Sequence, residues 1–270
     1  MLLFTIFLTV ISVLLGISLG STRISPADFL QAVFSGSTTD STYRIVMYSR
    51  LPGVLGALLA GSALSVSGAI LQSVLQNPLA SPNIIGVNSG AGLMVLLCSA
   101  FFPAMDALLP FAAFLGALAT AMLIFALAMG PGVSRITLVL TGIAMSSILG
   151  AGMNCIMILY PDAYIGASTF LVGGLSGLTI QGLRFPAIYI LIGLLLAMLM
   201  RRDMNIIALG TDTAKALGMS VNRTRFLLIF TAAILAGAAV SFAGLIGFVG
   251  LVVPHAIRFL IGNDNRYLVP

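Results

Sequence analysis

Charge is scarce in this sequence. Only 7% of the 270 residues are charged, with 12 Lys or Arg, seven Asp, no Glu and a single His. Because a typical soluble domain is about 25% charged, so few charges cannot cover the surface of a soluble fold of this length. This shortage excludes a soluble enzyme, a secreted disulfide scaffold and a nucleic-acid-binding protein. The formal net charge of +5 therefore indicates basic loops beside apolar spans rather than a nucleic acid partner.

Groups for catalysis and for binding ions or nucleotides are equally scarce. Cys98 and Cys155 lie inside apolar runs without metal-ligand spacing, so we expect both to be small packing residues. No Asp falls in the middle of a clear span, which argues against an intramembrane protease or a proton-coupled pump. The only lysine, Lys215, is not part of a Gly-x-x-x-x-Gly-Lys-Ser/Thr motif that would bind ATP. We therefore predict no catalytic residue, no metal site and no cofactor bound by this chain.

Long apolar segments dominate the sequence, in which 60% of residues are hydrophobic. A helix needs about 20 apolar residues to cross a bilayer, and continuous rather than alternating apolar runs favour helices over a barrel. We predict an all-α, polytopic transmembrane helical bundle that forms a single domain over 1–270. The first run is expected to be a retained helix rather than a signal peptide. The eight predicted spans, of which the sixth is short and the eighth broken, are 1–20, 51–75, 84–102, 110–129, 136–159, 185–201, 224–243 and 246–262.

The basic residues are divided unequally between the two sides of these spans. One side holds Arg23, Arg44, Arg50 and Arg184. The side with more basic residues should be cytoplasmic, which places both termini in the cytoplasm. That side holds Arg135, Arg201, Arg202, Lys215, Arg223, Arg225, Arg258 and Arg266.

Small residues recur four positions apart within the spans. Such pairs let helix backbones approach closely, and the 29 glycines suit tightly packed membrane helices. The pairs are Gly86 and Gly90, Gly116 and Thr120, Gly142 and Ser146, and Gly237 and Ser241.

One polar connector combines charge with short apolar faces. Asp203 can N-cap a short helix that Gly210 ends, and Thr211 or Asp212 can cap a second helix that Gly218 ends. Helices of about six residues are not stable alone in water. Their apolar residues need a surface to dock on, which is either the chain's own bundle or a cytoplasmic partner. These residues are Ile206, Ile207, Leu209, Ala214 and Leu217.

Two other stretches interrupt the apolar pattern. Pro52 suits the first turn of a helix, whereas Asn77-Pro78 and Ser81-Pro82 stop that helix at the membrane surface. A broken segment inside a membrane must be buried in protein or line a water-filled cavity. His255 is more typical of a helix-end packing or hydrogen-bonding residue than of a ligand. The break is predicted where three glycines and a proline disfavour one straight helix, at Gly244, Gly247, Gly250 and Pro254.

Four segments together resemble the permease family of binding-protein-dependent ABC importers for iron-siderophores, haem and cobalamin. The resemblance runs from the first span to Pro270 and implies the type II ABC importer permease fold in a bacterial cytoplasmic membrane. The implied partners are a second copy or paralogue of the permease, two cytoplasmic ATPase subunits that bind ATP and Mg, an extracytoplasmic substrate-binding protein and membrane lipid. The segments are RLPG at 50–53, AGSALSVSGAILQSVLQNPLASPNIIGVNSGAG at 60–92, NIIALGTDTAKALGMSV at 205–221 and AGLIGFVGLVVPHAIRFLIG at 243–262.

The resemblance also assigns roles to residues. Arg50 matches the first Arg of an Arg-Leu-Pro-Arg motif that receives carboxylates of the substrate-binding protein, Gly53 replaces the second Arg, and Arg44 is the candidate substitute. The segment 203–218 matches paired coupling helices that seat on the ATPase, with the residues Asp203, Asn205, Ile206, Ala208, Leu209, Gly210, Thr211, Ala214, Leu217 and Gly218. The translocation path and its gates are expected at Asn77, Pro78, Asn88, Ser89, Gly244, Gly247, Gly250, Pro254, His255 and Arg258.

The function implied by the resemblance is ATP-driven alternating access, in which the ATPases move 203–218. We expect the cargo to be an iron(III)-siderophore, with cobalamin and haem as alternatives. Two other classes remain open: a secondary transporter with its site at the break at 244–254, and a non-transporting membrane scaffold. Family members usually continue for two further spans, so we expect this chain to be a fragment, a truncated reading frame or an incomplete sequence.

Overall fold

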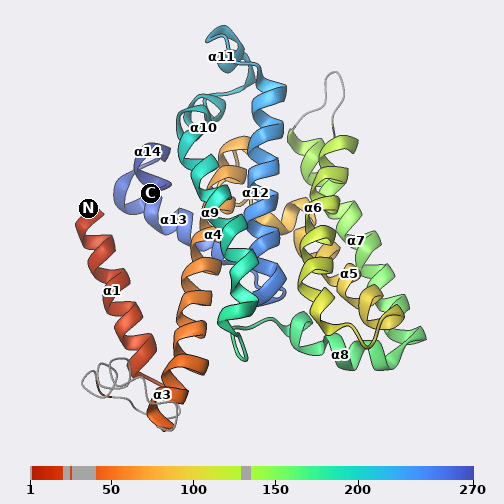
Figure 1. Cartoon of the computed structure of the whole chain (residues 1–270). Helices are drawn as coiled ribbons and strands as arrows, with labels where there is room; N and C mark the ends of the chain where they lie inside the picture. The colour runs from red at the N-terminus through yellow and green to blue at the C-terminus, as the bar shows by residue number, and fades with distance from the viewer. Residues whose placement is uncertain (1, 21–24, 26–40, 129–134) are drawn as a thin grey trace. The chain divides into compact units, whose positions relative to one another are not determined.

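The computed structural model describes residues 2–20, 25, 41–128 and 135–270, and the regular structure of this part of the chain is entirely helical. Arg23 lies outside the described residues. The elements, shown in Figure 1, are α1 (Leu2–Ser18), α3 (Ser41–Ile45), η1 (Val46–Arg50), α4 (Leu51–Leu75), η2 (Pro82–Ile85), α5 (Val87–Phe101), η3 (Asp106–Leu108), α6 (Leu109–Leu127), α7 (Arg135–Leu159), α8 (Pro161–Val172), α9 (Ile180–Leu199), α10 (Arg201–Ala208), α11 (Thr211–Ala216), α12 (Val221–Ala243), α13 (Val249–Ile261) and α14 (Asn265–Leu268).

Each predicted apolar run coincides with a helix. Three runs give shorter apolar helices, at Thr5–Ser18, Val87–Phe101 and Val249–Ile261. This pattern confirms the predicted all-α, polytopic bundle. By length and composition, five helical segments of the described chain can cross a membrane: Ser41–Leu75, Asp106–Leu127, Ile136–Leu159, Ile180–Leu199 and Val221–Ala243.

Helix α8 lies between the fifth and sixth predicted spans, where no helix was expected. Pro161 is its first residue, a position at which the missing N–H does no harm. Gly173 follows its last residue with a φ of +75°. In the sequence, Pro161, Asp162 and Gly166 suggest a loop, whereas a proline at the first position of a helix is favourable. Helix α9 likewise begins earlier than predicted, at Ile180.

Pro52 is the second residue of α4 and so lies in the first turn of that helix, as predicted, but α4 continues directly from a preceding helical turn. Residues Ser41–Leu75 form one helical segment, in which the π-helix η1 directly precedes α4. At its end the N–H of Leu51 donates to the carbonyl of Val46, five residues back. In a regular α-helix the ring of Pro52 would clash with the carbonyl four residues before it, and the wider π-turn offers room at this point.

The described chain groups into two compact units. The first consists of residues 1–59 and 175–185, and it contains α1, α3, η1 and the beginnings of α4 and α9. The second consists of residues 60–174 and 186–270, and it contains α5 to α8 and α10 to α14. That the chain is a single domain stays a prediction.

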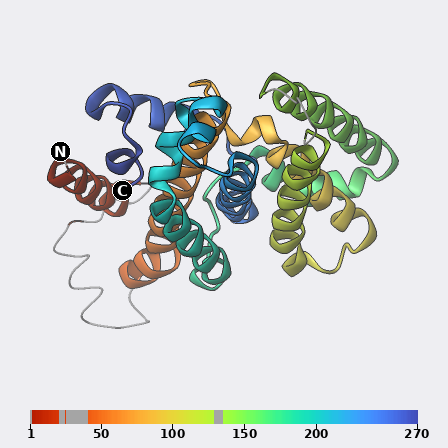
Figure 2. The same cartoon turned by 90° about the horizontal axis from the view of Figure 1, so that it is seen from above.

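The core of the second unit is a close crossing of α5, α6 and α12, which Figure 2 shows with α12 viewed nearly along its axis. Gly90 of α5 and Gly116 of α6 face each other, since a β-carbon on either would collide with the backbone carbonyl of the other. Gly237 of α12 faces Ala117, to which an added β-carbon would approach within 3.2 Å. The prediction of close packing is therefore confirmed at Gly90, Gly116 and Gly237, one residue from each of three predicted pairs.

The two cysteines differ in their surroundings. Cys98 is buried on α5, whereas Cys155 is exposed on α7. Helix α7 is the least buried of the five helices that are long enough to span a membrane. The prediction of a packing role is therefore confirmed for Cys98 and wrong for Cys155.

We predict opposite effects for the same substitution at two glycines. Gly116→Ala should lower the melting temperature in detergent, because its β-carbon would lie 2.6 Å from Met94 Cγ and overpacking typically costs about 1–3 kcal/mol. Gly150→Ala on α7 should preserve or raise it, because a β-carbon there meets no atom within 4 Å and Ala is favoured over Gly in helices by about 0.5–1 kcal/mol. Equal melting temperatures for the two variants would contradict the close crossing.

Candidate functional site

The predicted paired helices of 203–218 are present as α10 and α11, which follow α9 and lead into α12 (Figure 1). Gly210 and Gly218 lie just beyond the ends of α10 and α11, with φ values of +116° and +82°. Residues other than glycine rarely adopt a positive φ, so glycine allows the chain to turn at these two positions. The predicted helix ends at these two glycines are confirmed.

The predicted caps are wrong. Asp203 lies inside the first turn of α10, and no side chain caps either helix. Met200 is the one residue between α9 and α10, and its carbonyl accepts a hydrogen bond from the N–H of Met204 at 3.0 Å. Because backbone hydrogen bonding continues from α9 into α10, few N–H groups remain for a cap to satisfy. Gly210 takes the cap position of α11, ahead of Thr211.

Helices α10 and α11 are attached by one face and exposed on the other. Met204, Ile207 and Ala214 are at most 1% exposed, whereas Leu209 and Leu217 are 64% and 62% exposed. One face therefore packs on the chain itself, and two leucines are left available for a further surface. Of the other predicted coupling residues, Ala208 and Gly218 are exposed, and Asp203, Asn205, Ile206, Gly210 and Thr211 are half-buried.

Asn205 of α10 is the centre of a set of hydrogen bonds. Its Nδ2 donates to Asp264 Oδ1 at 2.6 Å, and its Oδ1 accepts from the backbone N–H and the Nδ2 of Asn265, at 2.9 and 2.8 Å. Asn265 Nδ2 also donates to Ser73 Oγ of α4, at 3.3 Å. Asn265 and Ser73 are 2% and 4% exposed. These four residues, the Asn205 network, connect α10, α14 and α4.

A second hydrogen bond joins α10 to the end of α4. Gln76 Nε2 donates to the carbonyl of Ile207 at 2.7 Å. Gln76 directly follows the last residue of α4 and has a φ of +47°. The predicted end of this helix before Asn77-Pro78 is thus confirmed, and the same turn contacts the backbone of α10.

The predicted break lies between Ala243, the last residue of α12, and Val249, the first of α13. The N–H of Gly174 donates to the carbonyl of Ala243 at 2.8 Å, and the N–H of Leu245 donates to the carbonyl of Phe170 at 3.1 Å. The C-terminal end of α8 therefore supplies partners to the broken backbone. This pairing meets the requirement for a break within a membrane, which survives only where its polar groups are satisfied.

Pro254 lies inside α13 rather than at its end. Because proline has no N–H, the carbonyl of Gly250 lacks its usual helical donor. Gln72 Nε2 of α4 lies 3.5 Å from this carbonyl and 3.5 Å from that of Leu251. Gln72 Oε1 accepts a hydrogen bond from Arg258 Nη1. A buried glutamine on α4 thus links Gly250 and Arg258, two of the predicted path residues.

Two of the predicted path residues, Gly247 and Gly250, lie beside η2. A β-carbon on Gly250 would lie 2.9 Å from Pro82 Cδ, and one on Gly247 would lie 3.4 Å from Asn83 Nδ2. Asn77 instead belongs to a turn, in which its Oδ1 accepts from the N–H of Leu79 at 2.9 Å. The remaining predicted path residues are exposed at Pro78 and His255, half-buried at Asn88 and Ser89, and buried at Gly244.

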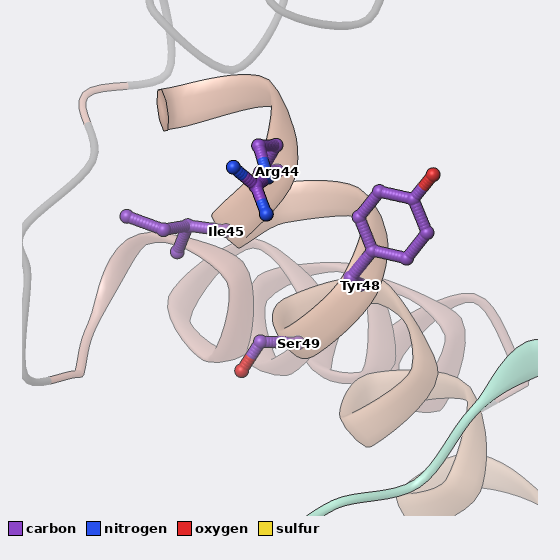
Figure 3. Close-up of a pocket in the computed structure, with 4 residues that line it drawn as sticks. All are labelled: Arg44, Ile45, Tyr48 and Ser49. Carbon is purple, nitrogen blue, oxygen red and sulfur yellow. The ribbon is translucent and has the colours of Figure 1, made fainter. Parts of the chain in front are cut away.

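The two arginines predicted for docking differ in exposure. Arg50 is half-buried, and its Nη1 donates to the carbonyl of Leu19 at 2.8 Å. Arg44 is exposed and lines an open hollow with Ile45, Tyr48 and Ser49, shown in Figure 3. Arg50 therefore ties the end of α1 to η1, whereas the Arg44 side chain is exposed at the hollow.

Several polar residues of this region were not singled out from the sequence: Gln72, Ser73, Gln76, Asp264 and Asn265. A signal was present for the first two, because a polar side chain inside an apolar run is expensive in a membrane and needs a partner. The partners themselves lie up to 192 residues away in the chain. Among the described residues, no three of His, Cys, Asp and Glu are gathered as metal ligands would be.

Two hydrogen bonds hold the pKa of the Asp264 carboxyl below its ordinary value. The main cause is the backbone N–H of Arg266, which donates to Asp264 Oδ1 at 2.9 Å, followed by the side-chain amide of Asn205. Asp264 is also the N-cap of α14. The ionised carboxylate therefore holds the start of α14 beside α10.

The model of the FecCD transport family matches residues 8–270. The chain is 37% identical to the Fe(3+)-citrate import system permease protein YfmE of Bacillus subtilis (strain 168), over 100% of this chain and 80% of that protein. It is 36% identical to the ferric enterobactin transport system permease protein FepD of Escherichia coli (strain K12), over 100% of this chain and 80% of that protein. It is also 36% identical to the hemin transport system permease protein HmuU of Yersinia pestis, over 100% of this chain and 81% of that protein.

A solved structure of an ABC transporter of the metal-chelate type, in an inward-facing conformation, has the same fold. The TM-score is 0.85 at 27% sequence identity, and the match covers 100% of this chain and 84% of that chain. The family match and this structural match extend over nearly the whole chain, including α10, α11 and the break.

Asp264 should contribute stability that is present at neutral pH and lost in acid. Its folded-state pKa is lowered from an unfolded value of about 3.9, so its contribution is complete above that value and is lost as the pH falls through the folded pKa. Asp264→Ala should therefore lower the melting temperature at pH 7, and the difference from wild type should shrink below about pH 4. Melting curves at several pH values test this, with the exposed neighbour Asn263→Ala as control. A difference that stays constant with pH would contradict the role of the ionised carboxylate.

Proposed function

Because the chain belongs to the FecCD transport family, it is a permease of the ABC importer class, and we propose that it carries an iron(III)-siderophore into the cell. The observation that supports the coupling role is the α10–α11 pair, which is anchored to its own bundle by Met204, Ile207 and Ala214 and leaves Leu209 and Leu217 exposed. An exposed apolar pair on short, anchored helices suits a partner surface.

The proposed partner at this surface is a pair of cytoplasmic ATPases that bind ATP and Mg. The chain itself has no Gly-x-x-x-x-Gly-Lys-Ser/Thr motif, so the energy for uphill transport comes from these subunits. We propose that ATP binding moves α10 and α11, and that this movement changes which side of the path is open. The complex would contain a second copy or a paralogue of this permease.

The proposed cargo follows from the relatives and from the lack of charge in the spans. The named relatives belong to systems for iron(III) citrate, ferric enterobactin and hemin. Charged substrate sites within a membrane require ionisable or strongly polar partners, and no Asp lies in the middle of a clear span. A path without such a site suits a bulky chelate whose selection occurs in the substrate-binding protein. Haem and cobalamin are the alternatives within the same family.

The proposed site for the substrate-binding protein is Arg44, in a connector that the distribution of basic residues along the sequence assigns to the extracytoplasmic side. Arg44 is exposed beside Tyr48, and Arg50 is engaged with the carbonyl of Leu19. Charge complementarity at such a surface gives orientation and a faster encounter. With this orientation in the bacterial cytoplasmic membrane, both ends of the chain face the cytoplasm.

The second transport class considered from the sequence is a secondary transporter, which would need an ion or substrate site of its own. Its ion or substrate site would be formed by the backbone of the break. The carbonyl of Ala243 and the N–H of Leu245 already pair with the end of α8, and the carbonyl of Gly250 lies beside Gln72. These internal hydrogen bonds favour the importer over a transporter whose ion site is formed by the same backbone groups.

The proposed coupling surface can be tested by affinity purification of the tagged permease with its ATPase. The double variant Leu209→Asp and Leu217→Asp should recover at least about tenfold less ATPase, equal to about 1.4 kcal/mol, because both side chains are exposed and would place charge in an apolar contact. The control is Asn222→Asp, which adds a negative charge at an exposed position at the start of α12. Equal recovery with all variants would place the ATPase contact elsewhere.

The proposed docking role of Arg44 can be tested by charge reversal. Arg44→Glu should weaken binding of the substrate-binding protein about tenfold and reduce the salt dependence of its association rate. Arg184→Glu changes the net charge equally at an exposed arginine outside the hollow, and it should have a smaller effect. Surface plasmon resonance with the permease in lipid discs measures both. Equal effects of the two variants would indicate a general charge effect and no specific site at Arg44.

A further inference from the structure

We propose that the Asn205 network carries the movement of α10 to the membrane helix α4, and so makes Asn205, Asp264 and Asn265 positioning residues for transport. This inference rests on the proposed function, because it takes α10 to be the element that the ATPase moves. The juxtaposition that carries it is one side chain on α10, Asn205, hydrogen-bonded to two consecutive residues that also contact α4 and cap α14.

The hydrogen bonds of Asn205 hold α10 against both separation from α14 and sliding along it. Asn205 uses both ends of its amide: Nδ2 donates to Asp264, and Oδ1 accepts two hydrogen bonds from Asn265. Three hydrogen bonds at 2.6 to 2.9 Å fix the rotation of this side chain as well as its distance. An apolar contact between helices resists separation but permits sliding, whereas these bonds also oppose sliding.

Because Asn265 is buried, water cannot easily replace the hydrogen bonds that it makes. Asn265 is 2% exposed, and its Oδ1 has no partner among the described residues, while its Nδ2 is shared between Asn205 and Ser73. Movement of α10 away from α14 would leave a further buried amide group unpaired, which is unfavourable. It is therefore easier for α10 and α14 to move together.

The network reaches α4 at a position where other contacts converge. Ser73 lies next to Gln72, which contacts Gly250 and Arg258 of α13, and one turn before Gln76, which donates to the carbonyl of Ile207. A displacement of α10 is thus applied to the last turn of α4 at two points. Because Gln72 is part of the same turn, that displacement also acts on the helix after the break.

The test uses the complete complex of permease, ATPase and substrate-binding protein in lipid discs. The measurement is the factor by which the substrate-binding protein stimulates ATP hydrolysis, a signal that must pass through the permease and that needs no identified cargo. Ser73→Ala should still assemble with the ATPase and keep basal hydrolysis within about twofold of wild type, because Ser73 lies on α4, outside the α10–α11 surface. For Asn205→Ala, the stimulation by the substrate-binding protein, taken relative to the basal rate of that variant, should fall at least about fivefold, because the Asn205 network no longer fixes α10 to α14 and α4.

Three further variants separate a positioning role from a general loss of structure. Asp264→Asn keeps an oxygen that can accept from Asn205 and from the backbone N–H of Arg266, so it should preserve the stimulation. Asn263→Ala changes the exposed neighbour, which is outside the Asn205 network, and should behave as wild type. Ser73→Ala removes only the link of the Asn205 network to α4, and it should reduce the stimulation without affecting assembly.

The outcomes distinguish this inference from the proposed function. If wild type neither assembles with the ATPase nor responds to the substrate-binding protein, the proposed function fails. If wild type responds and Asn205→Ala and Ser73→Ala respond equally well, the positioning role is overturned. It is also overturned if Asn205→Ala and Ser73→Ala lose assembly and basal hydrolysis together, since the network would then serve only to fold the segment.

Discussion

Every backbone polar group within a bilayer needs a partner inside the protein, and this constraint determines where the helices of this chain can break. The break after Ala243 exists because the end of α8 supplies the carbonyl of Phe170 and the N–H of Gly174. Pro254 removes one more donor, and Gln72 lies beside the carbonyl that this leaves unpaired. The irregular backbone around the break and the buried side chain of Gln72 therefore depend on each other, because the side chain lies beside a carbonyl that the helix leaves unpaired.

The end of helix α4 provides polar partners for three other elements. Its last turn carries the polar residues Gln72 and Ser73, and Gln76 directly follows it, in a segment that otherwise consists of small and apolar side chains. Each of them points to a different element: Gln72 to α13, Ser73 to α14 and Gln76 to α10. The helix that supports the break is thus the helix that holds the coupling segment. In the proposed importer, this shared support provides a direct mechanical route between the ATPase and the path.

The sequence predicted the helices better than the contacts between them. Long apolar runs identify spans because burial in lipid depends on composition, and glycines with positive φ end helices for local reasons, as at Gly210 and Gly218. Helix α8 was missed because Pro161 can begin a helix as well as interrupt one. The Asn205 network was missed because its bonds join residues 59 to 192 positions apart. Local patterns also gave Ala214 as part of an apolar face without revealing that the chain itself covers it.

The relatives help to locate where cargo selection occurs in the proposed importer. Permeases named for citrate, enterobactin and hemin systems are 36–37% identical to this chain over its full length. Cargoes this different in size and charge would require different ionisable groups if the spans themselves bound them tightly. This chain instead has uncharged span centres and places its buried polar residues in contacts between helices. Selection by a separate substrate-binding protein removes the conflict, because one set of helix contacts can then open and close around chelates that the permease itself does not recognise.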